Sequence, residues 1–312
     1  MYLLKIGKCT IERRVAEYMV NQLFGNYLVR KGLISKEQLG QAIESQKKVR
    51  VKLGLIAVSE KLMTAEEAAE VNKLQAVMDK RFGDIAVEKG YLTDDQVGRL
   101  LGLQGNQYLT FAQAITDNGF MTLDAFEKAF VDYQKELNFT ATDMDSIKSG
   151  DADRIVPLFV PEGTDPIQVE YISVAVRTII RLIDSDAYIG SASWGRNESF
   201  DGAAVQNLRG DRAAGLAFGG NGDSLLSIAE TFGKEEFPEV DLDALDSVAE
   251  FINCINGLFA TGIASKIKLD MLPPSYRNGL VKLSADRLVK MPVNILGREV
   301  MLVCAFGSTI SI

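Results

Sequence analysis

The sequence predicts two domains of different class: an all-α repeat module over residues 1–145, and an α+β domain over residues 167–312 in which long helices pack on an antiparallel sheet. The first half carries a repeat of 29 residues whose copies show helix start and stop signals. The second half alternates amphipathic helical patterns with strand-like runs. Residues 146–166, between them, are rich in Asp, Ser, Gly and Pro and are interpreted as a linker.

Composition limits the classes of function. The 312 residues carry a formal net charge of -8, and the sequence pI is about 4.9, so there is no overall attraction to nucleic acid or anionic lipid. The sequence has neither a run of about 18 apolar residues nor a secretory h-region. We therefore expect a cytoplasmic protein with no nucleic-acid binding and no membrane insertion.

The chain contains no histidine. The commonest general base and metal ligand is therefore missing, along with every Ser-His or Cys-His nucleophile. The three cysteines, Cys9, Cys254 and Cys304, are far apart and odd in number, which argues against a disulfide framework and a zinc site. We expect no metal site and no cofactor of the chain's own. Any chemistry must use carboxylates, amides, lysines or the groups of a partner.

The N-terminal module is predicted in order from its start. Residues 1–7 suggest a strand or irregular arm, residues 11–23 suggest a helix, and the repeat begins at Phe24. Matching residues recur at a period of 29. The matching columns are Gly25, Gly54, Gly83 and Ala112; Gly32, Lys61, Gly90 and Gly119; Ser35, Thr64, Thr93 and Thr122; and Gln46, Gln75 and Gln104.

Each copy is predicted to form a short helix, a turn and a longer helix. The glycine of the second column suits a helix end with positive φ, and the Ser or Thr three residues later suits an N-cap. Three copies also allow capping boxes, which pair Ser35 with Gln38, Thr64 with Glu67, and Thr93 with Gln96. Units of this kind bury their apolar sides against neighbouring units, so an all-α module is expected.

The repeat resembles the N-terminal domain of type II secretion and pilus ATPases of the GspE and MshE kind. The first copy is the closest match, through Gly25, Leu28, Gly32, Ser35, Leu39, Ala42 and Gln46. In the MshE branch, tandem copies bind cyclic di-GMP, and an arginine two positions before the first glycine belongs to the motif. Lys52 and Arg81 hold that position in the second and third copies and are the candidate nucleotide-binding residues.

The departures from that motif argue against a nucleotide site. Leu23 and Thr110 hold the arginine position in the first and fourth copies, and Lys61 replaces a turn glycine. Lysine also lacks the planar fork with which arginine bonds a guanine. We therefore expect that the repeats do not bind cyclic di-GMP tightly. The alternative to a nucleotide-binding module is a helical docking or spacer module.

The second domain is predicted from the periodicity of its apolar residues. One strand, at 155–160, is expected within the linker. The patterns then predict helix 167–183, strands 187–194, 203–208 and 213–218, helices 223–232 and 241–265, and strands 266–272, 279–283, 290–295 and 299–306. The glycine cluster at 219–222 lacks the Lys-Ser/Thr ending of a phosphate loop and is interpreted as a turn.

Residues 241–265 are the stretch most informative about function. Its apolar stripe predicts the buried face of an amphipathic helix and consists of Leu245, Val248, Ile252, Ile255, Phe259 and Ile263. On nearly the opposite side, at the same spacing, lie Asp246, Glu250, Asn253 and Gly257. Two carboxylates, an amide and a bare backbone patch therefore face outward in a row. This row is either a solvated helix face or a contact surface.

With helices and strands in this order, the row resembles the signature of the CheC/CheX/FliY phosphatases of bacterial chemotaxis. That signature is (D/S)-x-x-x-E-x-x-N, followed some twenty residues later by proline. The residues that fit it are Asp246, Glu250 and Asn253, with Gly257 in its extension and Pro273 or Pro274 at the required distance. One copy of the motif marks the CheX type, and the resemblance covers about residues 150–312.

The resemblance implies a phosphatase whose partner is a CheY-like receiver domain. The receiver supplies the phospho-aspartate, a magnesium ion and a lysine. Asn253 would orient the attacking water, and Glu250 would pair with the receiver's lysine. Asp246, Gly257 and the proline, Pro273 or Pro274, would belong to the docking surface. This chemistry needs no histidine.

Two functions from different classes remain open at this point. The first is an enzyme that dephosphorylates a receiver, with the repeats as a regulatory or docking module. The second is a signalling adaptor in which the same fold docks a receiver or forms a homodimer, and in which the repeats bind a pilus or secretion component. Retention of both Glu250 and Asn253 favours the enzyme.

Overall fold

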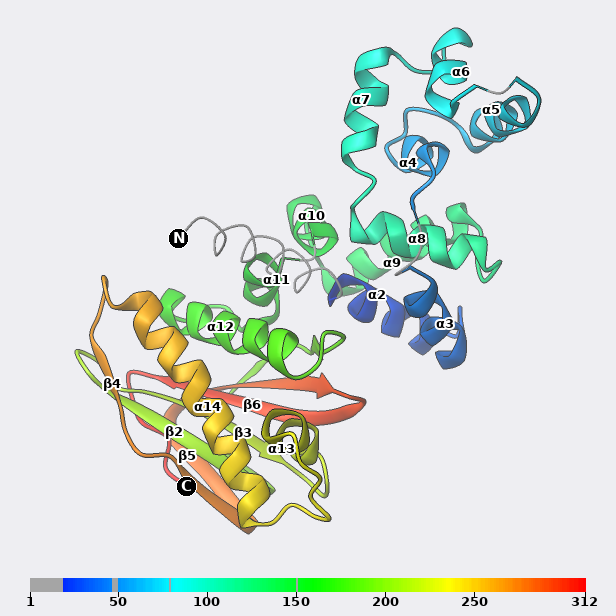
Figure 1. The fold of residues 1–312 in the computed structure, drawn as a ribbon. Helices are drawn as coiled ribbons and strands as arrows, with labels where there is room; N and C mark the ends of the chain where they lie inside the picture. The colour runs from blue at the N-terminus through cyan, green and yellow to red at the C-terminus, as the bar shows by residue number, and fades with distance from the viewer. Residues whose placement is uncertain (1–18, 47–49, 79, 150) are drawn as a thin grey trace, which may run out of the picture. The chain divides into compact units, whose positions relative to one another are not determined.

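The computed structural model describes residues 19–46, 50–78, 80–149 and 151–312 (Figure 1). The arm expected at residues 1–7, most of the helix expected at 11–23, and Cys9 lie outside this part. The chain divides into two compact units, one formed by Val20–Gly150 and the other containing Asp151–Ile312.

Helix–turn–helix pairs make up most of the N-terminal unit, as the repeat predicts. The pairs are α2 (Met19–Arg30) with α3 (Lys36–Gln46), α4 (Leu53–Ser59) with α5 (Ala65–Met78), α6 (Phe82–Glu88) with α7 (Asp94–Gly102), and α8 (Gln107–Asp117) with α9 (Leu123–Leu137). A further helix, α10 (Ala141–Ser149), follows them.

The turn within each pair has the predicted backbone conformation. Its φ angle is positive in every copy, at 69° for Gly32, 58° for Lys61, 73° for Gly90 and 70° for Gly119. The predicted capping boxes are also confirmed, with distances of 2.8 to 3.3 Å, at Ser35–Gln38, Thr64–Glu67 and Thr93–Gln96. Turn chemistry therefore sets where each longer helix begins.

Lys61→Gly is expected to raise the free energy of unfolding of the N-terminal unit by about 0.5–1 kcal/mol, because a residue with a Cβ is strained at positive φ. Urea unfolding followed by far-UV circular dichroism measures the change. Gly90→Ala is the inverse control and should lower stability, because Gly90 has a similar φ of 73°. A Lys61→Gly chain no more stable than the parent would contradict this expectation.

The helix pairs do not stack in chain order. The first pair packs on the fourth, where the Phe24 ring centroid lies 5.2 Å from that of Phe126 and 5.0 Å from that of Phe130. The second packs on the third, and a Cβ at Gly54 would lie 2.9 Å from the Phe82 ring. The expectation that units pack on their sequence neighbours is therefore wrong for the first and fourth copies. The first and fourth pairs carry large aromatic side chains, and these side chains bury a large apolar area when they pack against each other.

The strand predicted at 155–160 is wrong, and most of the linker predicted at 146–166 is helical, although the division between the two compact units does fall inside that range. These residues finish α10 and then form α11 (Ala152–Phe159). Isoleucine and valine favour strands, but a helix forms here because the buried residues recur at helical spacing. These buried residues are Ala152, Ile155, Val156 and Phe159. The connection to the next helix is irregular at residues 160–165.

The C-terminal unit contains helices and one antiparallel sheet. Its helices after α11 are α12 (Pro166–Leu182), α13 (Leu226–Gly233) and α14 (Leu242–Ile263). Its strands are β1 (Tyr188–Ile189), β2 (Ser193–Gly210), β3 (Ala214–Gly220), β4 (Leu269–Met271), β5 (Ser275–Ile295) and β6 (Arg298–Phe306). The three helices predicted between residues 167 and 265 are confirmed. The turn predicted at 219–222 is confirmed only from Asn221, because Gly219 and Gly220 pair with β2 as the last residues of β3.

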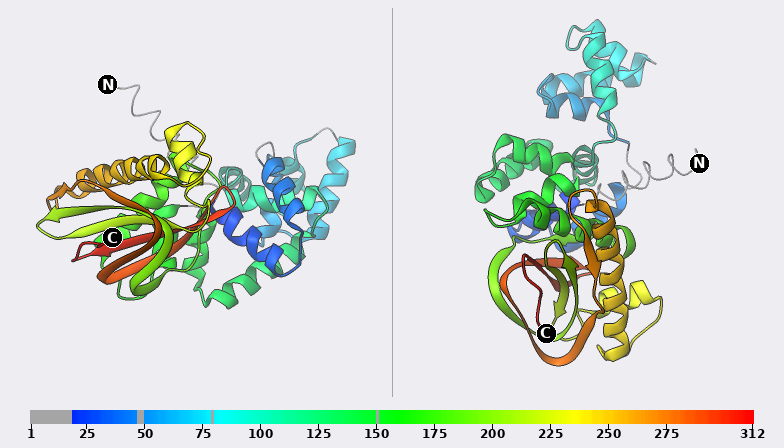
Figure 2. Two further views of the ribbon diagram at one scale, coloured as in Figure 1. Left: turned by 90° about the horizontal axis from the view of Figure 1, so that it is seen from below. Right: turned by 90° about the vertical axis from the view of Figure 1, so that its left-hand side faces the viewer.

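The sheet curls until two of its strands meet. The order of the six strands is β1-β5-β6-β3-β2-β4, and β5 pairs in addition with β2. Inside the curl lies an apolar cluster that includes Phe200, Leu283 and Ile310. The right-hand view of Figure 2 shows the end of the chain within the curl, and helices α12, α13 and α14 outside it. The unit is thus an α+β fold, and α14 packs along the outer face of the sheet.

Two strands are longer than predicted. The run expected at 187–194 divides between β1 and the start of β2, while β5 joins the runs expected at 279–283 and 290–295. The residues between those two runs continue the strand through a bulge. Gly195 of β2 pairs with Leu288, whereas Asn197 pairs with Ser284. An irregularity of this kind bends a strand without ending it.

Candidate functional site

Helix α14 carries the candidate site, and its buried face is fixed from both ends. The Asp241 side chain caps the helix by accepting a hydrogen bond from the backbone N of Ala244 at 2.9 Å. Further along, the Phe259 ring stacks on the Tyr171 ring with 3.9 Å between centroids. All six residues of the predicted apolar stripe are 0% to 1% exposed. The predicted buried face is confirmed, and the opposite face is therefore presented outward.

The predicted outward row lies on that opposite face. Asp246 and Glu250 are exposed, and Asn253 and Gly257 are half-buried. A Cβ built on Gly257 would meet no atom within 4 Å, so another molecule has room to approach the backbone there. The outward orientation is confirmed for Asp246 and Glu250, whereas Asn253 and Gly257 are partly covered.

The two carboxylates of the row differ in their surroundings. Asp246 accepts a hydrogen bond from the hydroxyl of Tyr276 on β5, and this carboxylate raises the pKa of Tyr276. Glu250 makes no hydrogen bond or ion pair with any residue in the described ranges. Glu250 and Asn253 are three residues apart on one helix, so their side chains are neighbours on its surface. The free carboxylate thus stands beside the amide.

The side chain of Asn253 is hydrogen-bonded to a buried residue of the sheet. Its Oδ1 accepts a hydrogen bond from Nε2 of Gln206 on β2, at 2.9 Å. Gln206 is 2% exposed. Because the oxygen of Asn253 is bound on the inner side, its NH2 group remains for contacts on the outer side.

The proline segment adjoins the same amide. The backbone carbonyl of Leu272 accepts a second hydrogen bond from Nε2 of Gln206, also at 2.9 Å. Pro273, which follows Leu272, is exposed, and Pro274 is half-buried. The chain between β4 and β5 is therefore brought close to Asn253, with Pro273 next to the shared contact.

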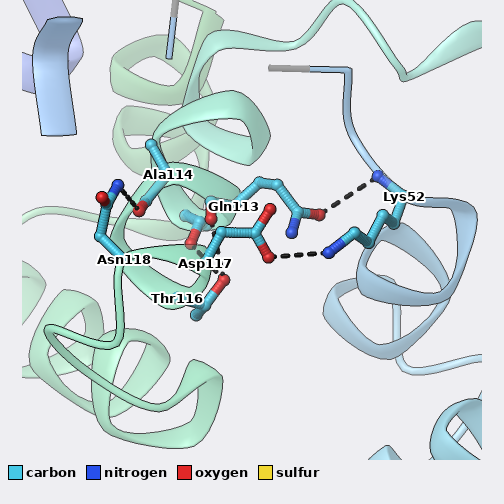
Figure 3. Close-up of polar contacts among 7 residues, drawn as sticks. Lys52, Gln113, Ala114, Thr116, Asp117 and Asn118 are labelled. Carbon is cyan, nitrogen blue, oxygen red and sulfur yellow. Dashed lines mark hydrogen bonds and ion pairs between the residues drawn. The ribbon is translucent and has the colours of Figure 1, made fainter. Parts of the chain in front are cut away.

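Lys52 and Arg81, in the other unit, occupy equivalent N-cap positions of α4 and α6. The Nζ atom of Lys52 lies 2.8 Å from Oδ1 of Asp117, and its backbone N donates to Oε1 of Gln113 at 3.2 Å (Figure 3). Arg81 is exposed and has no partner among the described residues. The two cations therefore have different environments, and the charge of Lys52 is already paired.

Gln206 is not among the residues that the sequence patterns predict. The available signal is a polar side chain inside the apolar strand run at 203–208, since a buried amide needs hydrogen-bond partners. Asn256 is a second case, because it lies beside the apolar stripe of α14 and is 0% exposed. Periodicity assigns such residues to a buried face but does not show what they contact.

The potential metal ligands and the thiols of the described residues are as follows. No group of three or more His, Cys, Asp or Glu residues there is placed to hold a metal ion. Cys254 and Cys304 are free thiols, and burial raises the pKa of Cys304 to about 12. Among the helices described, none combines the length and apolar character needed to cross a membrane.

Part of the C-terminal unit is similar to a known protein family. A family model described as "Chemotaxis phosphatase CheX" matches residues 203–287. The matched range contains Gln206, Glu250, Asn253 and both prolines. No curated protein matches the chain.

Several solved structures share similarity with the C-terminal half. CheX from Desulfovibrio desulfuricans is 12% identical, with 46% of this chain and 99% of that chain covered and a TM-score of 0.41. A CheC-like superfamily protein from Shewanella sp. PV-4 is 14% identical, with 46% and 99% covered and a TM-score of 0.40. The CheX-CheY-BeF3-Mg complex from Borrelia burgdorferi gives 16% identity, 44% and 94% coverage and a TM-score of 0.34.

Proposed function

We propose that this chain, whose C-terminal half is CheX-like, is a phosphatase that hydrolyses the phospho-aspartate of a CheY-like receiver domain. One observation carries the proposal. An unpaired carboxylate, Glu250, and an amide held by its oxygen, Asn253, stand one turn apart on the outward face of α14. Both residues lie within the range matched by the family model.

The reaction asks for positioning more than for acid–base catalysis. A water molecule attacks phosphorus, the bond from phosphorus to the aspartate oxygen breaks, and inorganic phosphate leaves with the oxygen of the water. The receiver brings the magnesium ion and the lysine that stabilise the transferred group. Asn253 supplies an NH2 donor that holds the attacking water in line with the leaving oxygen.

Glu250 has the complementary task of docking. An exposed carboxylate with no internal partner pairs with a lysine of the receiver without first breaking another contact. This pairing sets the register of the two proteins and brings Asn253 over the phosphoryl group. Gly257, one turn further along α14, leaves the backbone open to close approach.

Glu250→Gln is expected to raise the KM for the phosphorylated receiver by about tenfold, equal to about 1.4 kcal/mol of binding, with a smaller change in kcat. The reason is that glutamine keeps the shape of the side chain but removes its charge. Initial rates measured over a range of receiver concentrations separate the two constants. Glu299→Gln, which neutralises an exposed carboxylate on β6, is the matched control. Equal KM values for parent and Glu250→Gln would contradict the docking role.

The phosphatase and the adaptor are distinguished by one experiment. CheY-like receivers are phosphorylated with acetyl phosphate, and the decay of the aspartyl phosphate is followed with and without the full chain. The phosphatase shortens its lifetime catalytically, at less than one chain per receiver. An adaptor binds the receiver but leaves the lifetime unchanged at every concentration.

For the N-terminal unit we propose a docking or spacer role, and we expect no saturable binding of cyclic di-GMP at micromolar concentrations. The cation of Lys52 is paired with Asp117, and a lysine does not reproduce the bidentate bonding of arginine. Isothermal titration of the full chain with cyclic di-GMP tests this expectation. Submicromolar binding that is lost in Arg81→Ala would overturn it and make the nucleotide a regulator of the phosphatase.

A further inference from the structure

The amide of Asn253 is the outer end of a chain of buried hydrogen bonds. Behind Gln206, Oε1 accepts from Nδ2 of Asn256 at 2.8 Å. The Oδ1 of Asn256 in turn accepts from the hydroxyl of Tyr171 on α12 at 2.5 Å. Gln206 is 2% exposed, and Asn256 and Tyr171 are 0% exposed. The series Asn253–Gln206–Asn256–Tyr171, here called the amide relay, joins α14, β2 and α12.

The direction of every bond in the relay follows from one backbone group. The carbonyl of Leu272 can only accept, so the atom of Gln206 that contacts it must be the NH2 nitrogen. The second hydrogen of that nitrogen points to Asn253, which must therefore present its oxygen. The oxygen of Gln206 faces Asn256, which must present its own nitrogen. No other arrangement of the three amides places a donor opposite an acceptor at each of these contacts.

The far end of the relay is consistent with this direction. With its nitrogen turned to Gln206, Asn256 offers an oxygen to Tyr171, which must donate. Burial raises the pKa of Tyr171 well above its ordinary value, so the hydroxyl keeps its proton at any physiological pH. A donor is thus guaranteed at one end and an acceptor, the Leu272 carbonyl, at the other.

We propose that Gln206 is a positioning residue for catalysis: through the amide relay, it locks the Asn253 side chain with its oxygen inward and its NH2 group facing the receiver. This inference rests on the proposed function. An unrestrained asparagine side chain rotates and presents either its oxygen or its nitrogen. Oxygen outward would meet the anionic phosphoryl oxygens, whereas NH2 outward donates to the attacking water, so locking the amide keeps the site in its productive form.

Gln206→Leu tests the relay directly. Leucine fills a similar volume without a donor or an acceptor, so Asn253 is released while the buried position stays filled. We expect kcat to fall by about 10- to 100-fold, the range in which small misplacement of a catalytic group acts. Binding of the receiver, measured with its beryllofluoride-activated form, should stay within about twofold of the parent, because Gln206 is buried and does not reach the surface.

Gln168→Leu is the matched control. Gln168 is also a buried glutamine of this unit, at 4% exposed, and its Nε2 donates to a backbone carbonyl, that of Cys304, at 3.0 Å. The substitution removes the same chemistry from the core without touching Asn253, so kcat should be unchanged. Equal losses of kcat in the two variants would overturn the proposal, since the effect would then reflect general loosening of the core.

A double variant distinguishes positioning of Asn253 from a purely structural role of Gln206. In an Asn253→Ala background, Gln206→Leu should cause no further fall in kcat, because the group that it positions is gone. Tyr171→Phe, a milder change, should give a smaller fall in kcat than Gln206→Leu and serves if that variant does not fold. Parent-like kcat in both folded Gln206→Leu and Tyr171→Phe would overturn the proposal.

Side-chain NMR separates the relay from the proposed function. In the unmodified chain, the NH2 protons of Gln206 should exchange with solvent far more slowly than those of the exposed Gln41. Equally fast exchange would overturn the relay even if the chain is an active phosphatase. Slow exchange in a chain that dephosphorylates no receiver would support the locked amide but count against the proposed function.

Discussion

Replacing Asn253 with alanine is expected to reduce the rate of receiver dephosphorylation by at least about 100-fold, because the amide is the group proposed to place the attacking water. The fold should survive. The Asn253 side chain is half-buried, and among the described residues its side chain makes one hydrogen bond, which Gln206 donates. Its loss leaves Gln206 bound to Leu272 and Asn256, so we expect stability to fall by only about 1 kcal/mol.

The measurement is the decay of aspartyl phosphate under single-turnover conditions, together with receiver binding by fluorescence or calorimetry. Asn197→Ala is the control, because Asn197 is an exposed asparagine on β2 of the same unit. Binding should be similar in parent, Asn253→Ala and Asn197→Ala, and only Asn253→Ala should lose its rate. A parent-like rate for Asn253→Ala on a receiver that the parent dephosphorylates would remove Asn253 from the catalytic machinery.

The outward row of α14 is predictable from sequence because a helix converts spacing into direction. Six apolar residues at three- and four-residue intervals fix one face, and the residues between them at Asp246, Glu250 and Asn253 must then face the other way. The positive φ at Lys61 is predictable for a similar reason, since glycine holds the same turn position in the other copies. In both cases the relevant interaction is local.

Contacts between residues that are far apart in the sequence cannot be predicted from local spacing. The bond from Gln206 to Asn253 spans 47 residues, and that from Tyr171 to Asn256 spans 85. Nothing in a periodic pattern says which buried amide meets which. The same limit explains why the sequence predicts helix pairs in the N-terminal unit but not that Phe24 of the first pair meets Phe126 of the fourth.

The mistaken strand at 155–160 shows the limit of local propensity. Isoleucine and valine favour strands, and the flanking Asp, Gly and Pro suggested a linker. The helix forms because Ile155 and Phe159 lie one turn apart and are both buried on the same face of α11. Burial against the rest of the unit outweighs a preference worth at most about 1 kcal/mol.

Phe259→Ala is expected to lower the free energy of unfolding of the C-terminal unit by about 3–5 kcal/mol, the usual cost of replacing a buried phenylalanine by alanine. Phe259 is 0% exposed, and its ring stacks on that of Tyr171. Urea unfolding followed by tryptophan fluorescence reports on this unit selectively, because the chain has one tryptophan, Trp194, and it lies on β2. Unfolding of the N-terminal helical unit therefore does not contribute a tryptophan signal of its own.

Leu258→Ala is the matched control, since Leu258 precedes Phe259 on the same helix but is 41% exposed. It should change stability by no more than about 0.5 kcal/mol, as surface substitutions usually do. The contrast between two adjacent residues measures which face of α14 is buried. If both variants lost stability equally, the side chain of Leu258 would be packed as tightly as that of Phe259, and the assignment of Leu258 to the exposed side of α14 would be wrong.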